Sequence, residues 1–226
     1  RRSFAFFAIV AALTIVAAVV GWTVVRHNPA DAYALLPADV IPPEIKRSLH
    51  DSNFAVSAVD APAMAAFIIT NNVKVAFLEF GGCVTLGLST LYVTIFNGTM
   101  IGGVAALFAN HGFGTDFWET VAPHGFIELT AFTIAGAAGL IVTAGILYPG
   151  RMRRRDAIRI NAQRAGVLIT GVASMLLVAG TIEGFISPRR LPGDVRLTFG
   201  LITACLLVLY FGFAGRRERS AAPPPS

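Results

Sequence analysis

A histidine and two glutamates interrupt segments that are otherwise apolar enough to cross a bilayer. His124 and Glu128 stand at the start of one apolar run, and Glu183 stands near the end of the next. An ionised side chain at the bilayer centre costs roughly 2.5–3.5 kcal/mol on insertion scales, so such residues usually face a partner or a wet cavity. His124 and Glu128 are four residues apart and therefore share one face of a helix.

Three kinds of chemistry fit this residue set. The first is structural, with the acids hydrogen-bonded inside a helix bundle. The second is a proton relay or ligand site, because histidine and glutamate can exchange protons at moderate pH. The third is a zinc site formed by His124, Glu128 and Glu183 with an open fourth position. The HxxxE spacing lacks the second histidine of an HExxH helix. We therefore rank the structural interpretation first and the metal site last.

Composition places the chain in the membrane class. Its 226 residues are 55% hydrophobic and 14% charged, and the mean hydropathy is +0.68. Soluble domains are less apolar and carry about 25% charged residues. The net charge of +5 comes from short basic clusters between apolar blocks, a pattern that orients membrane proteins and does not indicate nucleic-acid binding. Cys83 and Cys205 have no CxxC partner and predict neither a disulfide framework nor a zinc ribbon.

The apolar blocks predict an all-α, polytopic membrane protein with about six transmembrane helices, one of them short or broken. A turn at Asn97-Gly98 is expected to separate the second span from the third. A plan of five spans with a re-entrant segment at 98–122 is the alternative. The predicted spans are Phe4–Val25, Val73–Phe96, Gly98–Asn110, Gly125–Tyr148, Gly166–Ile186 and Val195–Ala214.

Arginine placement predicts the orientation. The run Arg151–Arg159 is the strongest cytoplasmic signal, and Arg1-Arg2 and Arg216–Arg219 agree with it. The segment Asn110–His124 has no lysine or arginine and is assigned to the outside. Both termini are therefore expected in the cytoplasm, after an even number of crossings.

Four parts of the chain follow from this plan. Residues 1–26 form the first transmembrane helix, 62–215 the membrane core, and 216–226 a disordered cytoplasmic tail. Residues 27–61 form an extracytoplasmic segment with a short amphipathic helix near Pro43–His50. Proline suits the first position of a helix, and Lys46 and Arg47 are expected to turn to water.

Polar residues of different spans come to one predicted depth near the outer face. We expect His124, Glu128 and Glu183 to converge there, so that Glu128 lies within one water or ion of Glu183 or His124. Lys74 and Glu79 lie somewhat deeper in the second span. The predicted binding or functional cluster is Asn71, Asn72, Asn97, His124, Glu128 and Glu183, with Asn97 at the inner end of the second span.

Small residues four apart predict closely packed helices. Gly98-x-x-x-Gly102 and Ala135-x-x-x-Gly139 are such pairs. No Walker or GxGxxG motif follows a strand pattern, so we predict no nucleotide hydrolysis by this chain. We also expect no enzyme activity and no cofactor.

Three ordered motifs resemble the stage II sporulation protein M family over roughly residues 62–215. They are Asn71-Asn72 ahead of a helix ending in Asn97-Gly98, then His124-Gly125 with Glu128, then Glu183-Gly184-Phe185-Ile186-Ser187-Pro188. The resemblance implies an integral protein of the bacterial cytoplasmic (inner) membrane. Sporulation members of the family help anchor peptidoglycan-degrading enzymes during engulfment.

Two functions are therefore expected. The first is a non-enzymatic membrane scaffold or partner in cell-envelope (peptidoglycan) remodelling, bound to membrane lipid and to cell-wall hydrolases. The second is the membrane subunit of an ABC-2-like permease or transporter, which would form a homodimer and need a separate ATPase. Copurification with hydrolases favours the first function, and copurification with an ATPase favours the second.

Overall fold

A computed structural model describes residues 2–36, 61–185 and 191–213, without the side chains of residues 2, 33, 61–69 and 183–185. The predicted amphipathic helix near Pro43–His50, with Lys46 and Arg47, and the predicted tail 216–226 lie outside these residues.

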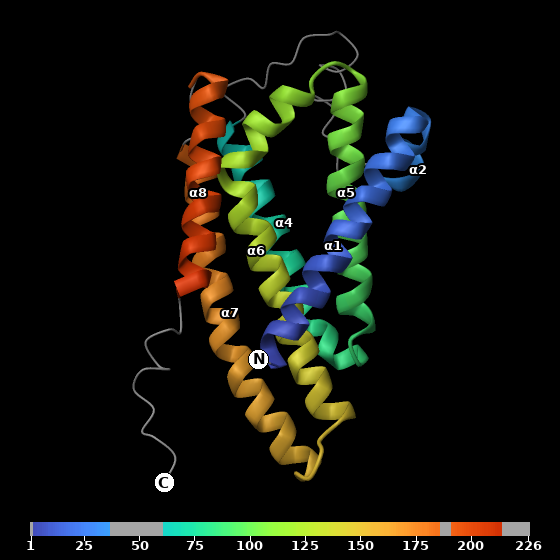
Figure 1. Cartoon of the computed structure of the whole chain (residues 1–226), viewed down its shortest axis with the longest axis vertical. Coiled ribbons are helices and arrows are strands. Elements are labelled where there is room, and N and C mark those ends of the chain that lie inside the picture. Colours follow the sequence, from blue (N-terminus) through green and yellow to red (C-terminus); the bar gives the residue numbers. More distant parts are fainter. Residues whose placement is uncertain (1, 37–60, 186–190, 214–226) are drawn as a thin grey trace.

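Six long helices run along the long axis of the described part of the chain, and successive ones alternate in direction (Figure 1). As a consequence, one end of the bundle holds the N-terminus of α1, the loop between α6 and α7, and the C-terminus of α8. The helices are α1 (Arg2–His27), α4 (Ala61–Gly81), α5 (Leu88–Asn110), α6 (Gly114–Leu147), α7 (Arg154–Phe185) and α8 (Gly193–Phe213).

Among the described helices, five are long and apolar enough to cross a membrane: α1, α5, α6, α7 and α8. Helix α4 runs beside them for 21 residues. The described residues contain no strand, so the predicted all-α polytopic class is confirmed. A short helix, α2 (Ala32–Leu35), follows a 3₁₀ turn at Pro29–Asp31. Ala32 and Leu36 are buried against the upper part of α5.

The predicted second and third spans are wrong in their bounds. Helix α4 ends at Gly81, a 3₁₀ turn covers Gly82–Thr85, and α5 begins at Leu88. Gly87 has φ +88°, a conformation that an L side chain rarely adopts, so the chain reverses here. The predicted turn at Asn97-Gly98 lies inside α5 instead, and the third span is a full helix of 23 residues.

Helix α6 starts earlier than predicted and absorbs most of the expected outer loop 110–124. It has 34 residues, with Pro123 inside it. Proline removes one backbone hydrogen bond and bends a helix, and the upper part of α6 leans away from the rest (Figure 1). His124 and Glu128 therefore stand well inside a helix and not at its entrance. Helix α7 likewise begins at Arg154, before the predicted Gly166.

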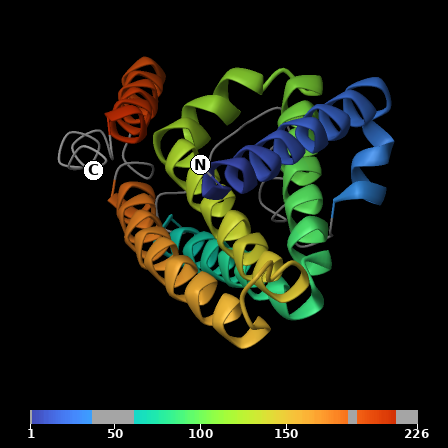
Figure 2. The ribbon, with the colours of Figure 1, turned by 60° about the horizontal axis from the view of Figure 1, so that its bottom comes forward.

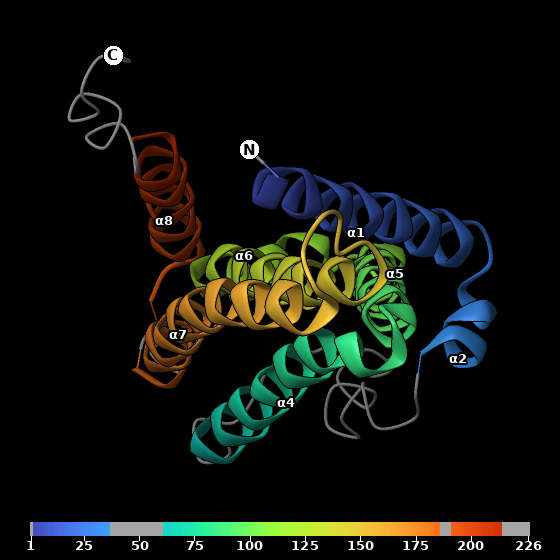
Figure 3. The same ribbon diagram turned by 90° about the horizontal axis from the view of Figure 1, so that it is seen from below.

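Helix α6 is the centre of the bundle and packs against α1, α4, α5, α7 and α8 (Figure 2). Of its most apolar stretch 67% is buried, against 6% for α8. Seen from below, α1 and α4 lie on opposite sides of α6, and α8 stands at the edge (Figure 3). Polar side chains on the buried part of α6 are therefore shielded from both lipid and water.

The predicted close helix contacts are confirmed. Helix α1 packs most extensively on α5, and a Cβ at Gly102 would come within 1.9 Å of the carbonyl oxygen of Ala18. Only glycine permits this approach of two backbones. The second pair, Ala135 and Gly139, lies on the buried face of α6 that meets α4.

Candidate functional site: two buried glutamates

Three helices bring buried polar side chains into the interior of the bundle. On α4, Asn72 and Glu79 are seven residues apart and share one face, since 3.6 residues make a turn. Helices α5 and α6 add the remaining members, which are three or four residues apart on each helix. The buried polar set of this region is Asn72, Glu79, Thr90, Thr94, Asn97, His124 and Glu128.

The Glu128 site joins α4 to α6. The Asn72 side chain interacts with the Glu128 carboxyl, although Nδ2 of Asn72 has no hydrogen-bond partner within 3.5 Å. His124 is buried one turn earlier on α6, and its Nδ1 also has no partner. A carboxyl beside a neutral amide can stay buried at lower cost than one in a purely apolar site, because the amide can donate to it.

The Glu79 site lies about 10 Å further along α4, from seven residues at 1.5 Å each. Glu79 is 2% exposed. Its Oε1 accepts a long hydrogen bond of 3.5 Å from Thr94 of α5, and its Oε2 has no partner. Its backbone oxygen accepts a 2.7 Å hydrogen bond from the Thr90 hydroxyl. Both threonines therefore hold α5 against the last turn of α4.

Helix α6 closes the Glu79 site with glycine. A Cβ at Gly139 would lie 2.7 Å from the backbone oxygen of Glu79 and 2.9 Å from that of Phe80. A Cβ at Gly136 would lie 3.6 Å from Glu79 Oε2 and 3.1 Å from a methyl group of Val10. Any larger residue at position 139 would push α6 off the end of α4.

The predicted cluster is only partly assembled. Asn72, Glu128 and His124 lie together, whereas Asn71, the neighbour of Asn72, is exposed. Asn97 is buried in the middle of α5, three residues from Thr94. The prediction that Asn97 closes the inner end of a helix is therefore wrong.

Glu183 belongs to the last turn of α7, but its side chain is outside the described residues. The predicted approach of Glu183 to Glu128 or His124 therefore stays a prediction.

Sequence reasoning gave Glu79 too little weight. The segment "KVAFLEFGG" places an acid in an apolar run directly before two glycines, which is the same signal that singled out Glu128. Its partners Thr90 and Thr94 come from the next helix, beyond a turn that the sequence placed elsewhere.

The described side chains contain no group of three histidine, cysteine, aspartate or glutamate residues that could hold a metal ion. The weak zinc candidate of His124, Glu128 and Glu183 depends on the last of these and stays a prediction. Within the described interior, the available chemistry is therefore that of carboxyl, amide, imidazole and hydroxyl groups.

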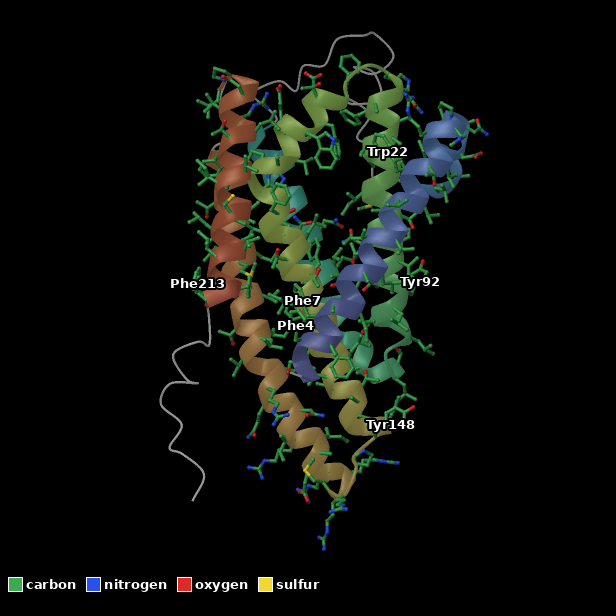
Figure 4. All side chains as sticks on the ribbon, viewed as in Figure 1. Phe4, Phe7, Trp22, Tyr92, Tyr148 and Phe213 are labelled. Carbon is green, nitrogen blue, oxygen red and sulfur yellow. The ribbon has the colours of Figure 1, made fainter. Side chains whose placement is uncertain are left out.

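Outside the interior, charge gathers at the lower end of the bundle. The side chains of Arg151, Arg153, Arg154 and Arg155 are exposed there, in the region where nitrogen-bearing side chains extend below Tyr148 (Figure 4). An exposed tyrosine next to such a cluster is typical of a membrane–water interface.

Helix α8 is attached to α6 near the opposite end of the bundle. Arg196 forms an ion pair of 3.1 Å with Glu119, and Gly200 packs on the backbone of Ala122. Gly200 is the single buried residue of α8. Most of the other residues of this helix are exposed and can contact lipid or another protein.

Comparison with known proteins agrees with the resemblance of the motifs. The family model of stage II sporulation protein M matches residues 9–188. An uncharacterized protein of Methanocaldococcus jannaschii is 28% identical over 124 residues, which are 54% of this chain and 70% of the relative. No solved structure matches the chain. The family match starts earlier than the predicted 62–215, includes most of α1 and both buried glutamates, and ends before α8. The chain belongs to the stage II sporulation protein M family.

Proposed function

We propose that this protein is a non-enzymatic scaffold or partner protein of the bacterial cytoplasmic membrane that acts in cell-envelope remodelling. The family match over residues 9–188 carries the proposal. The exposed apolar surface of α8 supports it, because a helix held by one edge leaves a membrane-embedded face for a partner helix. The partners of this proposal are cell-wall hydrolases or the proteins that hold them.

Photo-crosslinking in native membranes tests the proposal. A photoreactive residue at Leu206 or Tyr210, both exposed on α8, should capture a hydrolase or its anchor. The same residue at Val16 or Val19, exposed on α1, provides the matched control and should capture less of it. Equal capture at the two helices, or capture of an ATPase in place of a hydrolase, would contradict the scaffold role.

The proposal includes an orientation with both termini in the cytoplasm. The arginines at the lower end support it, because lysine and arginine are enriched on the cytoplasmic side. Single cysteines at Arg153 and at Thr115, both exposed, should react with a membrane-impermeant thiol reagent from opposite sides. In whole cells the reagent should label position 115 and not position 153, and the reverse pattern would overturn the orientation. The two native cysteines are first changed to serine.

A permease-like subunit is the second candidate, and the buried glutamates favour it. Ionisable groups inside a membrane bundle often mark a path for a substrate or proton. This function requires an ATPase partner, since the sequence has no nucleotide-binding motif. Stoichiometric copurification of an ATPase in place of a hydrolase would favour it over the scaffold.

A further inference from the structure

We propose that Glu79 is a proton-binding site, with its carboxyl protonated in the packed bundle and deprotonated only when the corner between α4 and α5 loosens. The proposal is independent of the scaffold and permease alternatives. Three features of the surroundings of Glu79 support it.

The first feature is the lack of a compensating charge. The carboxyl is almost fully buried, and Oε2 has no hydrogen-bond partner. On α4 itself, Lys74 is exposed. On α5, the titratable residue is Tyr92, which is 67% exposed. An ionised carboxylate without a partner in such a place is very costly, so the group neutralises instead.

The other elements around Glu79 add no cation. Helix α1 contributes Val10, and the 3₁₀ turn contributes Cys83, which is partly buried. On α6 the nearest titratable residue is Glu128, eight residues before Gly136 and therefore about 12 Å along the axis. Helix α7 lies against α4 through Val172 and Leu176, which are apolar. No described basic side chain forms an ion pair with Glu79.

The second feature is an excess of hydrogen-bond acceptors. Glu79 is two residues from the end of α4, where the last carbonyl groups give the negative end of the helix dipole. The backbone oxygens of Glu79 and Phe80 both face Gly139. The described donors are the Thr90 hydroxyl, which is directed at a backbone oxygen, and the Thr94 hydroxyl at 3.5 Å. A site rich in acceptors and poor in donors stabilises a protonated carboxyl, because the acid then becomes a donor.

The third feature is tight packing, which selects a proton over a metal cation. Even a Cβ added at Gly136 would press on Val10 and touch Glu79 Oε2. A hydrated cation is larger than this space allows, and no three-ligand group is present among the described side chains. A proton needs no additional volume.

Loss of the proton would place a negative charge against the end of α4. The adjoining turn, Gly82–Thr85 with Gly87 at positive φ, leads into α5, which Thr90 and Thr94 hold to α4. We therefore expect deprotonation to open this corner and admit water. Proton binding and corner closure are then one coupled equilibrium.

Infrared difference spectroscopy of the whole protein in lipid nanodiscs tests the proposal. The wild type should show the carbonyl band of a protonated carboxylic acid at neutral pH. Glu79→Gln, which keeps the shape and supplies an amide donor, should lose that component. Glu128→Gln and Glu119→Gln should retain it. Absence of the band in the wild type, or its persistence in Glu79→Gln, would overturn the proposal.

Thr94→Val provides a second variant in case Glu79→Gln does not fold. Among the described residues, Thr94 supplies the hydroxyl that donates to the Glu79 side chain, so the protonated band should shift in frequency and remain present. Thr133→Val is the control, because Thr133 bonds its own helix backbone at Leu129. A band that is equally unaffected by Thr94→Val and Thr133→Val would argue against Glu79 as its source.

Discussion

Glu79 and Glu128 are buried in the same bundle, but different surroundings offset the cost of burying each carboxyl group. Glu128 lies within α6 and has a neutral amide, Asn72, beside it. Glu79 lies at the end of α4, has one distant hydroxyl donor and is enclosed by glycines of α6. The Glu128 site depends on a polar partner, whereas the Glu79 site depends on close backbone packing. Changes in packing should therefore harm the Glu79 site most, and changes in polar partners should harm the Glu128 site.

Gly139→Val should have the largest effect, because its Cβ would lie 2.7 Å from a backbone oxygen that cannot turn away. We expect a loss of about 3 kcal/mol in the free energy of unfolding, as overpacking of a tight core produces. Denaturant titration in mixed micelles, followed by circular dichroism, measures it. Gly171→Val on α7 is the control, since a Cβ there meets nothing within 4 Å. Equal losses in the two variants would show that the Glu79 site is not tightly packed.

Thr90→Val should have the next largest effect. The change keeps the shape of the side chain and removes the 2.7 Å hydrogen bond to the backbone oxygen of Glu79. That oxygen stays buried, so we expect a loss of about 1.5 kcal/mol in the same titration. Thr170→Val is the matched control, because Thr170 is exposed and bonds only the preceding turn at Gly166. A loss no greater than in the control would mean that Thr90 does not hold the corner.

The sequence was sufficient for the class of fold and for much of the Glu128 site. Apolar block length predicted the helical membrane class, and motif order placed Asn72, His124 and Glu128 together. It could not decide which dipeptide breaks the long apolar run, because Gly81-Gly82 and Asn97-Gly98 are both turn signals. The choice depends on tertiary contacts, in which Thr90 and Gly139 fix the end of α4. The same contacts define the Glu79 site, which explains why its partners were not identified.

The sequence could not predict which face of α4 is turned toward α6. Asn71 and Asn72 are adjacent and chemically identical, yet one is exposed and the other is buried. Adjacent residues on a helix point about 100° apart, so only one of them can face α6. Which one does so is set by the packing of the whole helix and not by the motif.

Asn72→Ala should reduce the free energy of unfolding less than Thr90→Val does. It tests whether the Glu128 site depends on its polar partner. The change removes the amide that interacts with Glu128, and we expect a loss of about 1 kcal/mol. Asn71→Ala is a closely matched control on an exposed face of the same turn and should lose almost nothing. A larger loss from Asn71→Ala would show that the side of α4 assigned to the interior is wrong.

The smallest effect is expected for a third carboxylate, Glu119, whose situation differs from both buried ones. It pairs with Arg196 at 3.1 Å, and each side chain keeps 20% of its surface exposed. Solvent screens such a pair, so Arg196→Gln should reduce stability by no more than about 0.5 kcal/mol. The pair also fastens α8 to the upper end of α6, and its loss should loosen that end more than it destabilises the bundle. Hydrogen exchange should therefore rise in residues 193–200 and stay unchanged around Glu79. A loss in the free energy of unfolding as large as that of Thr90→Val would mean that α8 is part of the core. It would also mean that the Glu119–Arg196 ion pair stabilises the bundle as much as the close packing around Glu79 does.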